Sequence, residues 1–348
     1  MSAVGSSNPG YVVARVRARR GQLYGDEEYR KLVRMSPAEI ARFMEESTYE
    51  SAINALGSRH GGVDLVEYAL NQNLAVQFEA ILEWSEGELY DLVARYLRKF
   101  DAWNLKTVIR GVYTGAGREA VEADLIRAGE FDDRQIRRLL DADSIEAVVE
   151  AAEETIYDEP LRAAYPAFEE SDVLVPLENA VDRAFYDRLL TGLPGGEPVR
   201  QYEAFLEAEV DFRNAANALR LARSGAEIDP AEYFIDGGQL FTRTSLARLA
   251  RNLDELVEYV AGSQYADDLG PALRELEEAD SLIAFEQATD AALLAYADKL
   301  GTIHPVSVTP VISYILAKER EVENIRAIAR GKEAGLSADA IESELVIT

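Results

Sequence analysis

Apolar residues along most of the chain are three or four positions apart, a spacing that places them on one face of an α-helix. The clearest example follows Thr309-Pro310, where the apolar positions of one face are Val311, Ile315, Val322, Ile325 and Ile328. Strand-like alternation is limited to YVVARV (11–16) and DVLVP (172–176). The second aligns with DLVEY (64–68), which has a helical pattern, in the repeat described below. The pattern therefore predicts an all-α protein.

Helix starts are well marked in this sequence. Ser36-Pro37-Ala38-Glu39 and Asp229-Pro230-Ala231-Glu232 each combine an N-cap side chain, proline at the first helical position and glutamate at the third. Thr309-Pro310 is expected to begin a long helix in the same way. Further helices, rich in alanine and leucine, are predicted over 63–82, 172–190 and 279–300.

The chain contains three copies of one pattern. An acid followed three residues later by asparagine recurs at intervals of 110 residues, and an arginine follows each asparagine (Arg110, Arg220 and Arg330). The acids and asparagines, here called the brace residues, are Asp101, Asn104, Asp211, Asn214, Glu321 and Asn324. Other landmarks recur in the same order: Gly21-Gln22-Leu23, Gly129-Glu130-Phe131 and Gly238-Gln239-Leu240; Tyr49, Tyr157 and Tyr265; Glu67, Glu178 and Glu286.

A unit of this length can bury a core of its own, unlike the shorter repeats of solenoid proteins. The one segment of linker-like composition, TGLPGGEP (191–198), lies inside the second copy. The phase of the repeat therefore sets the boundaries. It predicts three helical repeat domains at 11–119, 120–228 and 229–348.

The brace residues allow two interpretations. An acid and an asparagine three positions apart lie on the same helix face, where they could form a metal or acid–base site. They could instead form a polar link between this helix and a neighbour, to an arginine or to the backbone of a turn. Repetition favours the link, because a fold repeated three times needs its internal brace three times, whereas a catalytic centre does not.

Gly331-Lys332 lacks the upstream glycine and the following Ser or Thr of a phosphate-binding loop, and the helix precedes it. We expect Gly331 to cap the C-terminus of that helix, with Lys332 complementing the helix dipole. Gly111 and Gly225 are the corresponding glycines of the other copies. Gly115-Ala116-Gly117 is expected to form a turn after a helix, and no dinucleotide-binding fingerprint is present.

The formal net charge is −27, and lysine is rare, with 6 Lys against 30 Arg. This balance disfavours binding to nucleic acid or to an anionic lipid surface. It is typical of a protein that remains solvated at high salt, where charge repulsion is screened. The chain has no cysteine. From the sequence we expect no secretory signal and no membrane span. We expect a soluble, cytoplasmic protein.

Candidate chemistry is otherwise sparse. His60 and His304 are both expected in loops, which is a weak basis for catalysis or metal binding. RVRARR (15–20) is the one basic cluster. It could be a solvated helix face, an intramolecular partner for the acidic surface, or a contact to another subunit. The sequence predicts no catalytic residue, no metal site and no cofactor.

Several segments resemble one family. VISYILAKEREVENIRAIARGKEAGLSADAIESEL (311–345) is similar to the C-terminal part of the C subunits of archaeal A-type ATP synthases, which are related to the d subunit of the vacuolar proton ATPase. FDAWNLKTVIRG (100–111) and RGQLYGDEEYRKLVRM (20–35) resemble other characteristic stretches of that family. The likeness covers nearly the whole chain, and the acidic, lysine-poor composition fits a member from a halophilic archaeon.

The resemblance implies three similar all-α domains arranged with pseudo-threefold symmetry as a funnel. Such a protein lies on the cytoplasmic face of the membrane rotor ring and receives the axle formed by the D and F subunits. It transmits torque for proton- or sodium-coupled ATP synthesis and catalyses nothing itself. We expect loops at one end of the three domains to contribute to the ring contact, together with the cavity wall.

Two other functions are compatible with the residues alone. A free-standing acidic helical-repeat scaffold for a cationic partner needs only the repeat and the charge. An enzyme that uses carboxylates between the domains would require a deep cleft with strongly perturbed acids.

Overall fold

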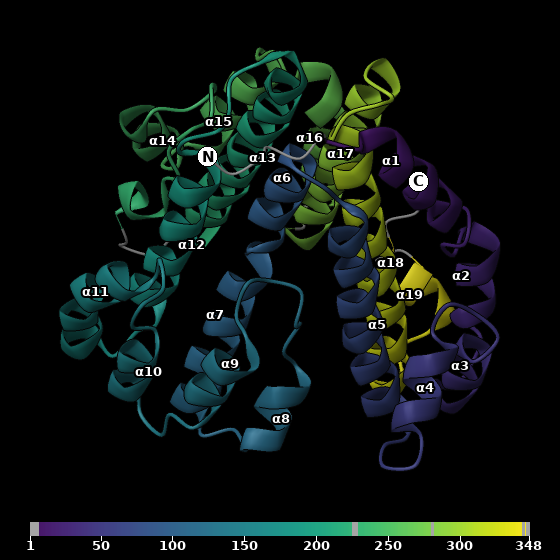
Figure 1. The fold of residues 1–348 in the computed structure, drawn as a ribbon. Coiled ribbons are helices and arrows are strands. Elements are labelled where there is room, and N and C mark those ends of the chain that lie inside the picture. Colours follow the sequence, from purple (N-terminus) through teal and green to yellow (C-terminus); the bar gives the residue numbers. More distant parts are fainter. Residues whose placement is uncertain (1–6, 225–228, 280–281, 343–344, 346–348) are drawn as a thin grey trace. The chain divides into compact units, whose positions relative to one another are not determined.

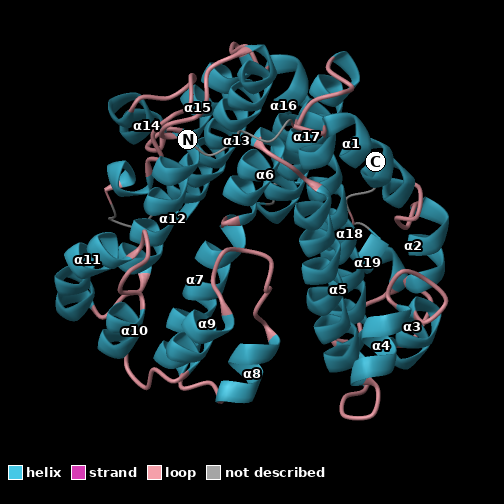
Figure 2. Cartoon of the chain, in the orientation of Figure 1, coloured by secondary structure: helices cyan, strands magenta, loops and turns pink. Residues whose placement is uncertain are grey.

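Every regular element in the described part of the computed structural model is a helix, which confirms the all-α prediction (Figure 2). The structure describes residues 7–224, 229–279, 282–342 and 345. The chain forms two compact units, one made of residues 1–145 with 306–348 and the other of residues 146–305. In those same described ranges no helix is both long and apolar enough to cross a bilayer.

The first unit begins with short helices and continues with three longer ones. They are α1 (Pro9–Arg20), α2 (Asp26–Leu32), α3 (Pro37–Met44), α4 (Glu50–Leu56), α5 (Gly62–Trp84), α6 (Glu88–Leu97), α7 (Lys99–Thr114), α8 (Arg118–Ala123) and α9 (Asp133–Leu140). The unit is completed by α18 (Thr309–Glu333) and α19 (Ala338–Glu342), from the end of the chain.

The second unit is built around two long helices, α13 and α17, that pack against each other. Its elements are α10 (Ile145–Ala151), α11 (Asp158–Ser171), α12 (Val175–Leu190), α13 (Glu197–Ser224), the 3₁₀ helix η1 (Pro230–Tyr233), α14 (Arg243–Leu249), α15 (Leu253–Ala261), α16 (Ala266–Ala279) and α17 (Leu282–Ile303). The pairs α11–α12 and α16–α17 each pack together, and α13 also contacts α14, α15 and η1.

Helix α18 lies inside the first unit although it comes from the opposite end of the chain. It packs against α5 and α1 and also contacts α2 and α3 (Figure 1). Its predicted apolar face is confirmed, because all five positions are buried: Val311, Ile315, Val322, Ile325 and Ile328. The last long helix therefore completes the core that the first helices begin.

Of the three predicted helix starts, the structure confirms the capping at Ser36 and differs at Asp229 and Thr309. Segment 11–16 lies within α1, so its strand-like pattern was misleading. Ser36 and Glu39 form the predicted capping box of α3. Asp229 instead caps the short 3₁₀ helix η1, and not an α-helix. Thr309 is itself the first residue of α18 and makes no side-chain cap.

The prediction that Gly331 caps a helix was wrong. Helix α18 continues to Glu333, and the left-handed residue beyond it is Gly335, with φ +74°. Gly331 is buried inside the helix, where a Cβ would lie 2.8 Å from the Ile341 side chain of α19. The glycine is needed for close packing of the short helix that follows.

Gly111 has the same role in the first copy, because a Cβ there would overlap the Val121 side chain of α8. The third glycine of this set, Gly225, lies outside the described residues. Gly115 has φ +69° and ends α7 in the left-handed conformation, as the expected turn requires.

Candidate functional site: the carboxylate–turn links

The first pair of brace residues lies on the buried face of α7. Asp101 is 3% exposed, and its carboxylate accepts hydrogen bonds from the backbone N–H groups of Glu130 (2.8 Å) and Phe131 (3.0 Å). These residues form the turn that leads into α9. Bonds from backbone N–H groups to a carboxylate are stronger than those between neutral groups. The acid therefore fixes a turn that comes after its own helix.

Asn104 holds the same connection one helical turn further along α7. Its amide Nδ2 donates to the carbonyl of Ile126 (2.8 Å), and its Oδ1 accepts from the N–H of Ile126 (2.8 Å). The side chain thus satisfies both backbone groups of one buried residue. This explains why an asparagine is placed in the middle of a helix, where its propensity is unfavourable.

The second pair repeats this geometry in α13. Asp211 accepts from the backbone N–H groups of Gln239 (2.8 Å) and Leu240 (2.9 Å). Asn214 exchanges two hydrogen bonds, of 2.8 and 2.9 Å, with the backbone of Ile235. The same residue types in the same register therefore make the same contacts on a different sequence background.

A glycine lies against each aspartate. A Cβ added to Gly129 would overlap the carboxylate of Asp101, and one added to Gly238 would overlap that of Asp211. The glycines at the start of the repeated Gly-x-Phe/Leu turns are therefore required by space. They let the turn backbone approach the acid closely enough for its N–H groups to donate.

Burial sets the ionisation of these acids. Desolvation raises the pKa of Asp101 to about 6, although the two backbone N–H donors lower it in part. The pKa of Asp211 is raised for the same reason and is likewise opposed by its backbone donors. Both carboxylates are therefore costly to bury in the charged form but are well hydrogen-bonded.

The third pair differs from the first two. Glu321, on α18, accepts from the backbone N–H of Tyr24 (2.7 Å), near the first Gly-x-Leu turn of the chain. Its other oxygen accepts from the Tyr49 hydroxyl (2.7 Å). Asn324 is buried, as Asn104 and Asn214 are. The last copy of the pattern therefore connects to the beginning of the chain.

A buried lysine completes this third link. Lys318 is 1% exposed and its ammonium lies 2.5 Å from the Glu321 carboxylate and 2.9 Å from the Tyr49 hydroxyl. It also lies 4.1 Å from the centroid of the Tyr49 ring, a cation–π distance. Burial lowers the pKa of Lys318, and the neighbouring Glu321 opposes that shift. Desolvation and the nearby Glu321 raise the pKa of Tyr49.

The sequence pattern did not point to Lys318. Its repeat equivalents, three residues before each acid, are Arg98 and Ala208, so the position has no common residue type. The available signal was the scarcity of lysine together with the spacing of Lys318 and Glu321 on one helix face.

The repeated arginines provide a more exposed set of links. Arg330 of α18 pairs with Glu67 of α5, and Arg220 of α13 pairs with Glu286 of α17 at 2.6 Å. Each pair joins two long helices and involves landmarks of the repeat. Exposed ion pairs contribute little stability, so these pairs contribute more to helix alignment than to folding free energy.

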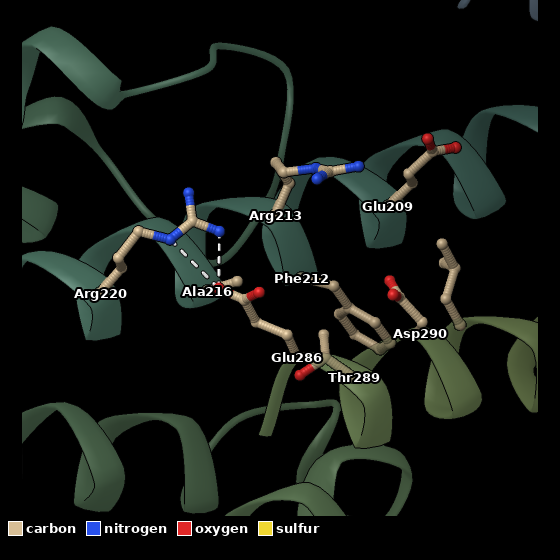
Figure 3. Close-up of a pocket in the computed structure, with 9 residues that line it drawn as sticks. Glu209, Phe212, Arg213, Ala216, Arg220, Glu286, Thr289 and Asp290 are labelled. Atoms are coloured by element: carbon tan, nitrogen blue, oxygen red, sulfur yellow. Dashed lines mark hydrogen bonds and ion pairs between the residues drawn. The ribbon is translucent and has the colours of Figure 1, made fainter. Parts of the chain in front are cut away.

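Two hollows lie in the second unit. A cavity of about 70 Å³ between α13 and α17 is bordered by Arg213, Arg220, Glu209 and Glu286, with Phe212 between the two helices (Figure 3). A more open hollow of about 440 Å³ is lined by charged and apolar residues that include Arg183, Asp187 and Phe234. Neither lining contains histidine or a phosphate-binding loop.

The remaining chemical candidates stay apart. His60 follows α4 and stacks edge-on against Tyr68, with ring centroids 4.7 Å apart. His304 follows α17 in a non-helical segment. Among the described residues no cluster of three or more His, Asp or Glu side chains is arranged to hold a metal ion.

Comparison with known proteins gives one consistent result. A family model described as ATP synthase (C/AC39) subunit matches residues 12–344. The A-type ATP synthase C subunit of Halorubrum lacusprofundi is 82% identical over 348 residues, which cover 100% of both chains. The A-type ATP synthase C subunit of Haloferax volcanii is 70% identical over 347 residues, again covering 100% of both. That of Methanococcoides burtonii is 35% identical over 98% of this chain and 95% of its own.

Glycine replacements test the space requirement at the turns. Gly129→Ala is expected to lower the free energy of unfolding by about 1–3 kcal/mol, because the new Cβ must displace the Asp101 carboxylate. Gly21→Ala is the matched control, since its nearest neighbour would be a backbone oxygen at 3.6 Å. Urea unfolding at constant salt measures both. Equal losses in the two variants would contradict the assignment.

The raised pKa of Asp101 predicts a pH signature. Its folded pKa of about 6 exceeds the ordinary value of 3.8, so the folded state binds more protons between these values. The stability that Asp101 contributes is therefore largest at low pH and declines as pH rises through this window. Relative to Asp101→Asn, the wild-type advantage should shrink by up to about 3 kcal/mol between about pH 4 and pH 6. An advantage that grows with pH would refute this.

The buried lysine and glutamate should be strongly coupled. Lys318→Met leaves the Glu321 charge without its cation and is expected to destabilise the protein by about 3–5 kcal/mol. Adding Glu321→Gln should recover most of that loss, because the neutral amide still accepts from Tyr24. A double-mutant cycle by chemical denaturation measures the coupling. Additive losses would show that the pair is not coupled.

Proposed function

Since this chain belongs to the ATP synthase (C/AC39) subunit family, we propose that it is the central-stalk component that joins the D–F axle to the membrane rotor ring. In this role it transmits torque during proton- or sodium-coupled ATP synthesis and catalyses no reaction. It lies on the cytoplasmic face of the membrane. The family match over residues 12–344 and the similarity to whole A-type C subunits support the proposal.

The observation that carries the mechanical part is the recurrence of buried acid–turn links. A protein that transmits torque must resist sliding of its helices under load. Packing alone is non-directional, whereas a carboxylate bonded to two backbone N–H groups fixes both position and orientation. Asp101 and Asp211 each make such a link to a turn outside their own helix. Glu321 makes a related link, with one backbone N–H and the Tyr49 hydroxyl as its donors.

The brace residues are thus proposed to be structural. Each acid lies in one sequence copy and bonds the turn region of another: Asp101 to residues 130–131, Asp211 to residues 239–240, and Glu321 to residue 24. In each of the domains predicted at 11–119, 120–228 and 229–348, the last long helix would then bond the first turn of another domain. In the third case, α18 near the end of the chain bonds the turn after α1.

Reconstitution tests the proposed role. Rotor-ring membranes mixed with the D–F pair should retain that pair only when this chain is present. Retention is measured by sedimentation and immunoblotting at the salt concentration of the source cells. The exposed, ion-paired Arg162→Ala variant is the control and should behave as wild type. Equal retention without the chain would reject the proposal.

The same experiment separates the main alternative. A free-standing acidic scaffold would remain in the supernatant and would not retain D–F on the sedimented membranes. A chain that binds the ring but not D–F would also contradict the linking role, although it would remain a component of the complex.

A further inference from the structure

The basic cluster 15–20 lies on α1, which has four arginines and no acidic residue in a protein of net charge −27. Its apolar face is buried through Val12, Val13 and Val16. The opposite face is exposed, with Tyr11 at 51%. The helix is thus held firmly in the first unit while it displays a basic and aromatic surface.

Two of the arginines are used within the unit. Arg19 donates to the backbone carbonyl of Gln77 (3.1 Å), and Arg20 donates to the hydroxyl of Ser313. Both acceptors are neutral groups, on α5 and α18. These residues attach α1 to the two long helices that it packs against.

Arg15 is used differently. Its guanidinium carbon lies 4.7 Å from the centroid of the Tyr11 ring and 4.6 Å from that of the Trp84 ring, both cation–π distances. The guanidinium carbon of Arg19 also lies over the Trp84 ring, 4.3 Å from its centroid. In the part of the chain that the structure describes, Arg15 makes these ring contacts and no hydrogen bond or ion pair, even though Glu83 and Glu86 flank Trp84.

The stack is fixed in place by Asn8. Its Nδ2 donates to the carbonyl of Trp84 (2.8 Å), and its Oδ1 accepts from the N–H of Glu86 (3.0 Å). This side chain ties the start of α1 to the end of α5. The backbone that carries Trp84 is consequently held beside the start of α1, so this part of the stack is preorganised for binding.

A stacked guanidinium suits one kind of partner group. The two rings lie close to the Arg15 guanidinium, and its in-plane N–H groups match a carboxylate in bidentate geometry. Tyr11 and Val306 are both exposed, and Val306 approaches Gly10, so apolar contacts are available beside the charge. The surface fits a carboxylate side chain with an apolar neighbour.

High salt favours a direct contact between Arg15 and a carboxylate over long-range attraction. The two relatives of highest identity reported above, from Halorubrum lacusprofundi and Haloferax volcanii, come from halophilic archaea, and at molar salt the Debye length is only about 3 Å. Long-range attraction between an acidic protein and a basic patch is then screened. A direct, bidentate and stacked contact is screened much less, so the preorganised Arg15 is the feature that can still select a partner.

We propose that the Tyr11–Arg15–Trp84 stack is a docking site for an acidic peptide segment of another protein of the ATP synthase. The inference deepens the proposed function, because it places one contact of this chain on α1. It depends on membership of the complex and not on the link between axle and ring.

Photocrosslinking identifies the occupant directly. Benzoylphenylalanine in place of Ala14, an exposed residue next to Arg15, leaves the stack itself intact. Irradiation of the assembled complex should yield an adduct with a peptide of another synthase protein that contains Asp or Glu. No adduct, or an adduct only with lipid or with a peptide lacking Asp and Glu, overturns the proposal.

Charge reversal tests the role of Arg15. Arg15→Glu should reduce retention of the chain in the complex at least tenfold. The charge-conserving variant Arg15→Lys should also be retained less than wild type, because an ammonium cannot make the bidentate contact. The exposed Arg162→Glu is the control. Reversing the crosslinked acid to Arg should rescue Arg15→Glu, whereas absence of rescue, or wild-type retention of Arg15→Glu, counts against the docking site.

An unchanged melting temperature of Arg15→Glu shows that the fold is intact. Sedimentation with vesicles of anionic phospholipid tests whether the stack binds a membrane surface instead of a peptide. Binding of wild type that is lost in Arg15→Glu would assign the stack to a membrane surface and reject the peptide. The proposed linking function fails separately, when wild type itself does not retain D–F on the ring.

Discussion

The structure depends on buried carboxylates that accept hydrogen bonds from the backbone of a distant turn. Asp101 and Asp211 each bond two consecutive N–H groups, and the adjacent glycine is required for that approach. An isolated charge in such a place would be strongly unfavourable. It is tolerated because the turn supplies donors in fixed positions, which makes the link specific as well as strong.

The third link shows how the same device adapts when its chemistry changes. Glu321 has one more methylene than aspartate and reaches Tyr24, beyond the glycine turn, so Gly21 has space that Gly129 and Gly238 lack. Its charge is balanced by Lys318 and not by backbone groups alone. This link joins α18 to the first helices, so residues from both ends of the chain form one core. Folding of the first unit therefore requires the last long helix.

Much of this architecture could be predicted from the sequence. Helical spacing identified the buried face of α18, and the interval of 110 residues identified Asp101, Asp211 and Glu321 as equivalent. A bond to the backbone of a turn was one of the alternatives for these acids. Which turn each acid bonds could not be predicted, because a repeat pattern gives register within a copy but not the partner copy.

The errors have local physical causes. Gly331 resembles a helix cap because glycine and lysine follow a long helix, but close packing of Ile341 against the helix is a tertiary effect. The burial of Lys318 depends on Tyr49, far away in sequence. Asp229 begins a 3₁₀ turn although its residues match an α-helical N-terminus. The environment of Lys318 is decided by a contact distant in sequence, and that of Gly331 by packing of the short helix that follows. Local preference alone predicts neither.

Hydrogen exchange tests the central claim most directly, since the acids are held to fix turn backbones. The amide hydrogens of Tyr24, Phe131 and Leu240 should exchange as slowly as those in the buried helices, because each is bonded to a buried carboxylate. The measurement is site-resolved exchange of the native protein at the salt concentration of the source cells. Exchange of these three amides at the rate of exposed turns would contradict the account.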